Sequence, residues 1–190
     1  MKDYKMKNKE QLIQKAEELG FKYEKEYRGC AQCTILAVMN TLGIDNPYIF
    51  KAATGLASGG GKMCDGVCGG YAGGIMAMSL IFGRSLDKVL DDNENKNTSF
   101  LMATQLREEF IKSYGTVICG EIHQKIFGHT FNMYDELDKK QFDDEGAHVD
   151  KCTSVVASAS REAMRLLLDE AERRGMTIDD IKEIGSIKTF

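Results

Sequence analysis

The chain has 190 residues, a hydrophobic fraction of 43% and a formal net charge of −4. This length is enough for one domain with a buried hydrophobic core. The small negative charge excludes the basic face that a nucleic-acid-binding protein needs, so no nucleic-acid partner is expected. The longest apolar run, residues 67–82, contains four glycines and a serine. It falls short of the roughly 20 apolar residues of a membrane-spanning helix, so no membrane span is expected.

Cysteine is the residue type that stands out in this composition. Residues 1–10 are polar and lack the apolar segment of a signal peptide, so we expect a cytoplasmic protein. In a reducing cytosol, several cysteines in one domain indicate metal binding or redox chemistry rather than structural disulfides. The six positions are Cys30, Cys33, Cys64, Cys68, Cys119 and Cys152.

The first part of the chain is expected to form two helices. Apolar residues recur at helical spacing over residues 8–27, and we interpret residues 1–28 as an N-terminal amphipathic helix packed on the core. Residues 30–42 are apolar on most sides and are expected to form a buried helix. Cys30 and Cys33 lie one turn apart near its start, where the helix dipole is expected to lower the pKa of a thiol.

A glycine-rich loop and a second buried helix follow. Residues 47–54 are expected to form a short helix, residues 59–66 the loop, and residues 68–82 the buried helix. Each glycine inside this helix costs up to about 1 kcal/mol relative to alanine, so close packing or a bound group must compensate. We expect Gly69, Gly70 and Gly73 to let a cofactor approach the helix closely. A glycine-faced helix also suits a homodimer.

The remaining chain reads as helices joined by polar segments. Residues 176–190 are interpreted as a C-terminal tail with a last short helix. No alternating strand pattern competes, so the fold class is all-α. We expect a compact single-domain helical bundle in which residues 29–175 form a cysteine-containing redox domain. The expected elements are a polar linker at 91–98, helices at 99–114, 121–127 and 149–174, and an acidic connection of weak helical character at 128–146.

Four of the cysteines fall at or beside the expected start of a helix. If these helix starts meet at one end of the bundle, their thiols meet as well. Such an end is electropositive and would stabilise thiolates or an anionic cluster. The four are Cys30, Cys68, Cys119 and Cys152.

The motifs around these four cysteines resemble the C_GCAxxG_C_C family of redox-active proteins. Residues 29–32 (Gly-Cys-Ala-Gln) resemble the surroundings of the family's first cysteine. Residues 68–73 resemble its central motif, with Gly70 where the family usually has alanine. Cys119 and Cys152 resemble its third and fourth cysteines. The match runs over roughly residues 23–171 in order and spacing.

The resemblance implies a cofactor and its ligands. The family is similar to the iron–sulfur domain of split-Soret cytochrome c, in which four cysteines hold a cluster. By that similarity, Cys30, Cys68, Cys119 and Cys152 are the expected ligands of an iron–sulfur cluster in an electron-transfer protein. Such a protein would work with a redox partner protein, and the resemblance identifies no enzymatic reaction. Covalent haem is not expected, because Thr34 rather than histidine follows the Cys-x-x-Cys spacing.

The cysteine pattern also allows two alternatives to an iron–sulfur cluster. Cys30 with Cys33 or Cys64 could serve a metal-free thiol–disulfide oxidoreductase or redox sensor. The two close pairs, Cys30 with Cys33 and Cys64 with Cys68, could instead hold zinc in a helical interaction protein. Zinc pairs usually stand on short polar loops, and the long apolar helices here favour iron–sulfur. Cys33 and Cys64 are therefore the less favoured ligands.

The three histidines are weaker candidates. His123 lies four residues after Cys119 and can share a helical face with it, as a ligand or proton donor. His129 and His148 are expected to be exposed in loops.

Overall fold

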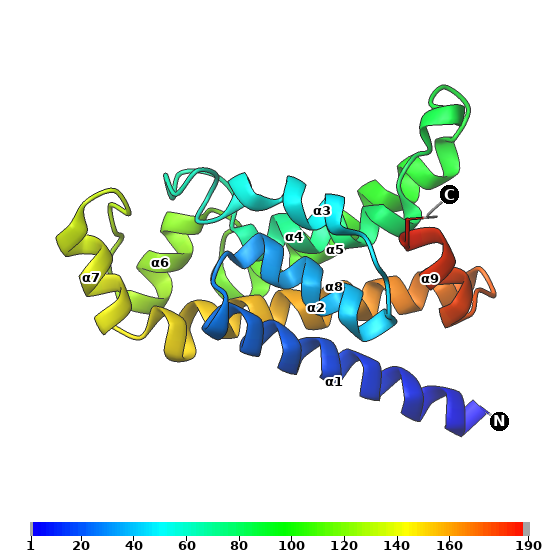
Figure 1. The fold of residues 1–190 in the computed structure, drawn as a ribbon, viewed down its shortest axis with the longest axis horizontal. Helices are drawn as coiled ribbons and strands as arrows, with labels where there is room; N and C mark the ends of the chain where they lie inside the picture. Colours follow the sequence, from blue (N-terminus) through cyan, green and yellow to red (C-terminus); the bar gives the residue numbers. More distant parts are fainter. Residues whose placement is uncertain (1, 188–190) are drawn as a thin grey trace.

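The computed structural model describes residues 2–187, with side chains described for residues 8–187. Within this part of the chain there are nine α-helices and no β-strand (Figure 1). The all-α fold class is therefore confirmed. Met1 of the expected N-terminal helix and residues 188–190 of the expected tail lie outside the described residues.

The long helix α8 (Cys152–Arg173) is the central element against which several other helices pack. Helix α1 (Lys2–Glu26) lies along it, and α2 (Cys30–Leu42) and α4 (Gly69–Phe82) also pack against it (Figure 1). Small side chains such as Ala159 and Ala163 are fully buried on α8 and let these neighbours approach closely. The expected apolar faces of α1, α2 and α8 thus meet in the main core and in a smaller cluster around Tyr23.

Helix α4 uses its glycines for packing inside the same chain. A Cβ on Gly73 would lie 2.4 Å from the carbonyl oxygen of Ala31 in α2. A Cβ on Gly74 would lie 2.7 Å from Leu106 in α5 (Asn93–Tyr114). Burial of α4 side chains such as Phe82 contributes about 1.5–3 kcal/mol each and offsets the glycine cost. Because these glycines face neighbours within the chain, they give no support for a homodimer.

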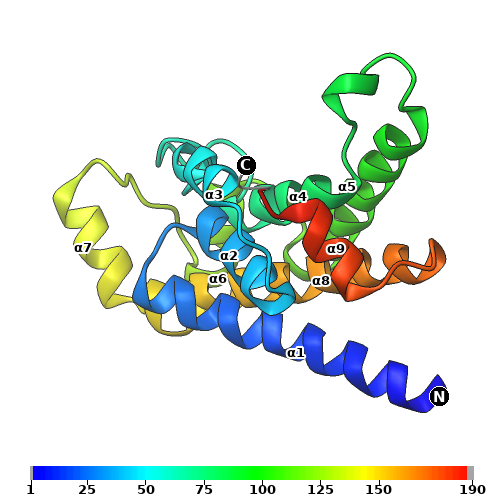
Figure 2. The same ribbon diagram turned by 45° about the vertical axis from the view of Figure 1, so that its right-hand side comes forward.

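Helix α5 begins earlier than expected, so the prediction of a polar linker over residues 91–98 is wrong from residue 93 onward. The Asp92 side chain caps the helix by accepting a hydrogen bond from the backbone N–H of Asn95. Arg174 donates to Asn95 Oδ1 at 2.7 Å and to Thr98 Oγ1 at 2.9 Å. Tertiary contacts with the end of α8 thus stabilise a first turn that is polar in sequence. The connection before it projects from the body of the molecule (Figure 2).

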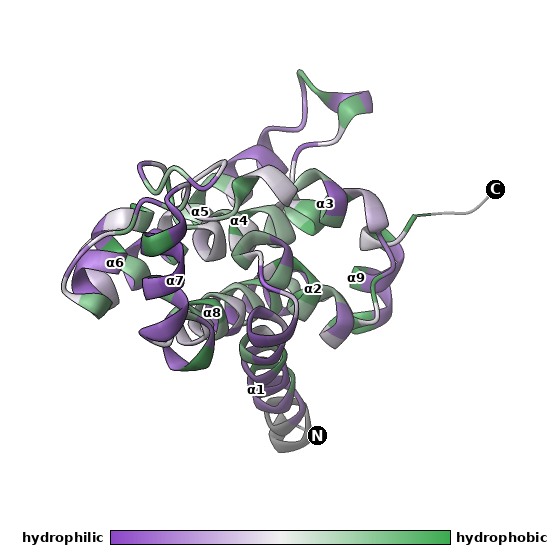
Figure 3. Ribbon diagram, turned by 60° about the vertical axis from the view of Figure 1, so that its left-hand side comes forward, coloured by the Kyte–Doolittle hydropathy of each residue, from purple (hydrophilic) through white to green (hydrophobic). Residues whose placement is uncertain are grey.

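Helices α6 (Cys119–Phe127) and α7 (Glu136–Asp144) form the other end of the molecule. The prediction of weak helical character over residues 128–146 missed α7, which is dominated by hydrophilic residues (Figure 3). Asp135 caps α7 by accepting from the backbone N–H groups of Leu137 and Asp138. Phe142 is the single buried residue of α7, and it packs with Phe131 and Phe127.

The remaining elements close the fold. Helix α3 (Pro47–Ala52) and 3₁₀ turns at Thr54–Leu56 and Leu86–Lys88 lie in the connections. A π-helical turn, Ala147–Lys151, leads into α8. Helix α9 (Ile178–Gly185) begins at a capping box, with Thr177 as the N-cap, and buries Ile181 completely. Among the described helices, none is both long enough and apolar enough to cross a bilayer.

Candidate functional site

Four cysteines that line one cavity stand where four helices begin. Cys30, Cys119 and Cys152 are the first residues of α2, α6 and α8, and Cys68 is the N-cap of α4. All four line one cavity of about 150 Å³, named here the thiol cavity. The spacing of helix starts indicated such a meeting, and the structure brings the four expected ligands to one place.

Glycine makes room for one of these sulfurs. A Cβ on Gly69 would lie 2.3 Å from Cys30 Sγ, so only glycine leaves space for that sulfur. A Cβ on Gly70 would lie 3.7 Å from Cys68 Sγ, an ordinary contact distance. Of the three glycines expected at a cofactor, two therefore lie beside cysteine sulfurs. Gly73 instead lies against the backbone of α2.

Backbone hydrogen bonds hold the glycine-rich loop against the start of α6. The N–H of Cys68 donates to the Val117 carbonyl at 2.7 Å, and the N–H of Gly120 donates to the Cys64 carbonyl at 2.7 Å. Between these bonds, Val67 and Ile118 form an isolated antiparallel bridge. Cys64 adopts a left-handed backbone with φ of 60°, which costs a non-glycine residue about 1–3 kcal/mol. The loop thus places the Cys64 thiol beside α6 at an energetic cost.

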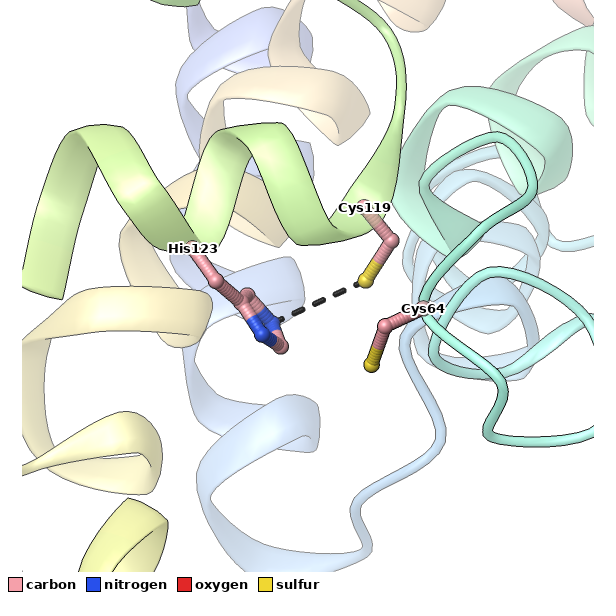
Figure 4. Close-up of side chains that lie close together, drawn as sticks. All are labelled: Cys64, Cys119 and His123. Carbon is pink, nitrogen blue, oxygen red and sulfur yellow. Dashed lines mark hydrogen bonds between the residues drawn. The ribbon is translucent and has the colours of Figure 1, made fainter. Parts of the chain in front are cut away.

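Cys64, Cys119 and His123 form the tightest group of metal-binding atoms in the described residues (Figure 4). One ligand atom from each lies within 4.8 Å of the others, and all three residues are buried. Cys119 Sγ lies 3.6 Å from His123 Nε2, and Cys152 Sγ lies 3.9 Å from the same nitrogen. Thiolate sulfur and imidazole nitrogen are ligands that suit zinc and other thiophilic ions. Cys64, the less favoured ligand in sequence, therefore belongs to the closest donor group.

His123 has few polar neighbours other than these sulfurs. Its ring lies 5.2–5.8 Å, centroid to centroid, from the rings of Phe127, Phe131 and Phe142. Its Nδ1 is buried without a hydrogen-bond partner. The Nε2 is therefore the ring atom that faces the thiols.

Cys33 lies apart from this group. Its Sγ donates to the backbone carbonyl of Arg28 at 3.3 Å and interacts with Glu24. Cys33 is not among the residues that line the thiol cavity. We therefore leave Cys33 out of the ligand set.

Burial governs the protonation of most of the thiols. Desolvation raises the pKa of Cys30 and of Cys152, and raises that of Cys68 to about 11. The expectation that the helix start lowers the pKa of Cys30 is wrong, because desolvation outweighs the dipole. Cys64 differs: a hydrogen bond from Cys119, helped by His123, lowers its pKa. The same bond raises the pKa of Cys119.

The other two histidines differ in their exposure to solvent. His129 lies between α6 and α7, is 40% exposed and pairs with Glu145 at 3.0 Å, as expected for a surface loop. His148 is not exposed as expected: its side chain is only 16% exposed and lines the thiol cavity. Side chains of α1 and α7, Glu24 and Asp143, flank it, and neither contact is visible in the local sequence. Glu24 and Asp143 also line the cavity, and neither was predicted as a site residue.

The fold and the site together define an all-α protein whose helix starts converge on a cavity of thiols. The chain belongs to the C_GCAxxG_C_C family, described as "Putative redox-active protein", whose model matches residues 28–166. All six cysteines lie within that range, and the expected family is confirmed. No curated protein and no solved structure matches the chain.

Proposed function

We propose that the protein holds an iron–sulfur cluster in the thiol cavity and passes electrons to or from a partner protein. The ligands in this proposal are Cys30, Cys68, Cys119 and Cys152. One observation carries it: four thiols from four helix starts line a single cavity. An all-thiolate donor set suits an iron–sulfur cluster, and Gly69 leaves the room that the Cys30 sulfur occupies beside the cavity. When bound, such a cluster supplies one-electron transfer.

The chain's own residues prepare the site in this proposal. Buried thiols of raised pKa hold their protons in the metal-free protein and release them when a metal binds. Val155 and Val156 give the cavity an apolar wall, while Arg28 and Lys62 bring positive charge to it. The six cysteines are unpaired in the structure. We propose a cytoplasmic location, where thiols stay reduced and available to bind a metal.

Anaerobic purification tests this proposal. We expect a brown protein with iron and acid-labile sulfide, and loss of both in Cys68→Ser. Cys33→Ser is the matched control, because Cys33 is buried but lies outside the cavity, and it should keep the iron. A colourless protein without iron, or a Cys68→Ser variant with a full cluster, would overturn the proposal. A metal-free protein whose thiol count changes by two on reduction would point to thiol–disulfide chemistry instead.

A second candidate is a single zinc ion held by Cys64, Cys119 and His123. Their mutual distances within 4.8 Å favour it. This ion and the four-cysteine cluster share Cys119, so they exclude one another. Cys64→Ser should abolish stoichiometric zinc binding and spare an iron–sulfur cluster. Cys30→Ser should abolish the cluster and spare zinc. The two variants therefore separate the candidates by metal analysis alone.

A further inference from the structure

A buried carboxyl group at the thiol cavity is only partly satisfied: it interacts with the Cys33 thiol, and one of its oxygens has no hydrogen-bond partner. Glu24, near the end of α1, is 3% exposed and lines the cavity. Its Oε2 has no hydrogen-bond partner, and neither has the Nδ1 of the neighbouring His148. An unsatisfied buried polar group costs about 1–3 kcal/mol, so two in contact invite a functional explanation.

Glu24 begins a line of titratable groups that runs outward. Glu24 Oε1 lies 3.6 Å from His148 Nδ1, and His148 Nε2 lies 3.6 Å from Asp143 Oδ1. The side chains of these three residues are 4%, 16% and 35% exposed, in that order. The line therefore leads from the interior of the cavity to water.

We propose that Glu24, His148 and Asp143 form a proton path between water and the thiol cavity, which lets the cavity take up a proton when it takes up an electron. The inference rests on the redox function proposed above. In the balanced step, a one-electron donor is oxidised, and a cluster held in the cavity would gain that one electron. One proton passes from water through Asp143 and His148 to Glu24. On oxidation the electron leaves to an acceptor and the proton returns to water by the same path.

The electrostatics of Glu24 suit this exchange. Burial raises the pKa of its carboxyl to about 7, against the opposing effects of Cys33 and Arg28. The carboxyl is thus poised to gain or lose a proton near neutral pH. An added negative charge in the cavity raises the pKa of a nearby carboxyl further and draws in a proton. The other charged or titratable residues that line the cavity are Arg28, Cys30, Lys62, Cys68, Cys119, His123, Lys139, Asp143, His148 and Cys152. Cys33 of α2 lies against Glu24 as well.

His148 suits the middle position. Burial and the charge of Arg28 lower its pKa, so the ring is neutral at pH 7. A neutral imidazole accepts a proton on one nitrogen and donates from the other. Each 3.6 Å gap is a few tenths of an ångström longer than an N–H···O hydrogen bond, a distance that a small side-chain movement closes.

The reduction potential of the purified protein as a function of pH tests the path. With dithionite as reductant, the wild-type potential should fall as pH rises through the region around 7. In Glu24→Gln this pH dependence should be lost over the same range. Glu26→Gln, an exposed change on the same helix, should keep it. A Glu24→Gln protein with the wild-type pH dependence would overturn the inference.

A second measurement does not depend on a cluster. Carbon-13 NMR of labelled glutamate in the metal-free full-length protein should show one carboxyl that titrates near pH 7, and Glu24→Gln should remove that signal. A Glu24 carboxyl that titrates in the ordinary range of glutamate would overturn the path even if the cluster is present. A missing cluster together with a Glu24 signal near pH 7 would overturn only the proposed function.

Discussion

Replacing Glu24 with glutamine should stabilise the metal-free protein at alkaline pH and leave it unchanged in acid. Glutamine mimics the neutral carboxyl, so it removes the penalty of a buried negative charge. The pKa of Glu24 rises from 4.5 to about 7 on folding. At about 1.4 kcal/mol per pKa unit, this rise corresponds to about 3 kcal/mol of unfolding free energy.

The sign follows from proton binding. Below pH 4.5 the carboxyl is neutral in both the folded and the unfolded chain, so Glu24 and glutamine are equivalent. Between pH 4.5 and 7 the unfolded chain loses its proton first, so the stability of the wild type falls as pH rises. Above about pH 7 the full penalty applies, and the variant should be more stable by about 3 kcal/mol.

Urea unfolding at pH 4.5 and pH 8, followed by circular dichroism under reducing conditions, measures this difference. The wild type and Glu24→Gln share every other titrating group. The change between pH 4.5 and pH 8 in the difference of their unfolding free energies therefore reports on Glu24 alone. Glu26→Gln should show no such change, because Glu26 is exposed. Equal stability differences at both pH values would refute the assignment of a raised pKa to Glu24.

Two further predictions test the packing that positions the site. Gly73→Ala should lower the free energy of unfolding by about 1–3 kcal/mol or more, because the new Cβ would meet the Ala31 carbonyl oxygen at 2.4 Å. Gly55→Ala, where nothing lies within 4 Å, should change it by less than about 0.5 kcal/mol in the same urea experiment. Arg174→Ala removes hydrogen bonds to the first turns of α5, each worth about 1.5–3 kcal/mol for a charged donor. It should therefore raise amide hydrogen exchange over residues 93–98 about tenfold or more, and unchanged exchange there would show that this turn forms without it.

The sequence specifies the helices around the cavity because the signals are local. Periodic apolar residues define α2 and α8, and glycines mark the breaks before and after them. The same local signals place Cys30 and Cys152 at helix starts. The family motif then groups the four cysteines, and the structure brings those four thiols to one cavity.

The rest of the site depends on contacts between distant segments. Cys64 comes beside Cys119 through backbone hydrogen bonds between a loop and a helix more than fifty residues later, which side-chain periodicity does not encode. Side chains of α1 and α7 cover His148. The acidic composition of α7 gives no apolar pattern from which this helix could be predicted.

Glu24 interrupts the apolar face of α1. It lies four residues after Gly20 and eight after Ala16, both buried, and therefore on the buried face of an amphipathic helix. A carboxyl on such a face departs from the apolar pattern, and departures of this kind tend to mark functional positions.

The origin of the thiol cavity in four separate helix starts has a consequence for biosynthesis. The first of its cysteines is residue 30 and the last is residue 152, so a nascent chain on the ribosome exposes three of these thiols before the fourth has been made. The complete set of four exists only after α8 has been synthesised and has packed against α1, α2 and α4. A cluster of the kind proposed would therefore find its four ligands together only after α8 has been made, and a chain truncated before residue 152 would carry three of these thiols without the fourth.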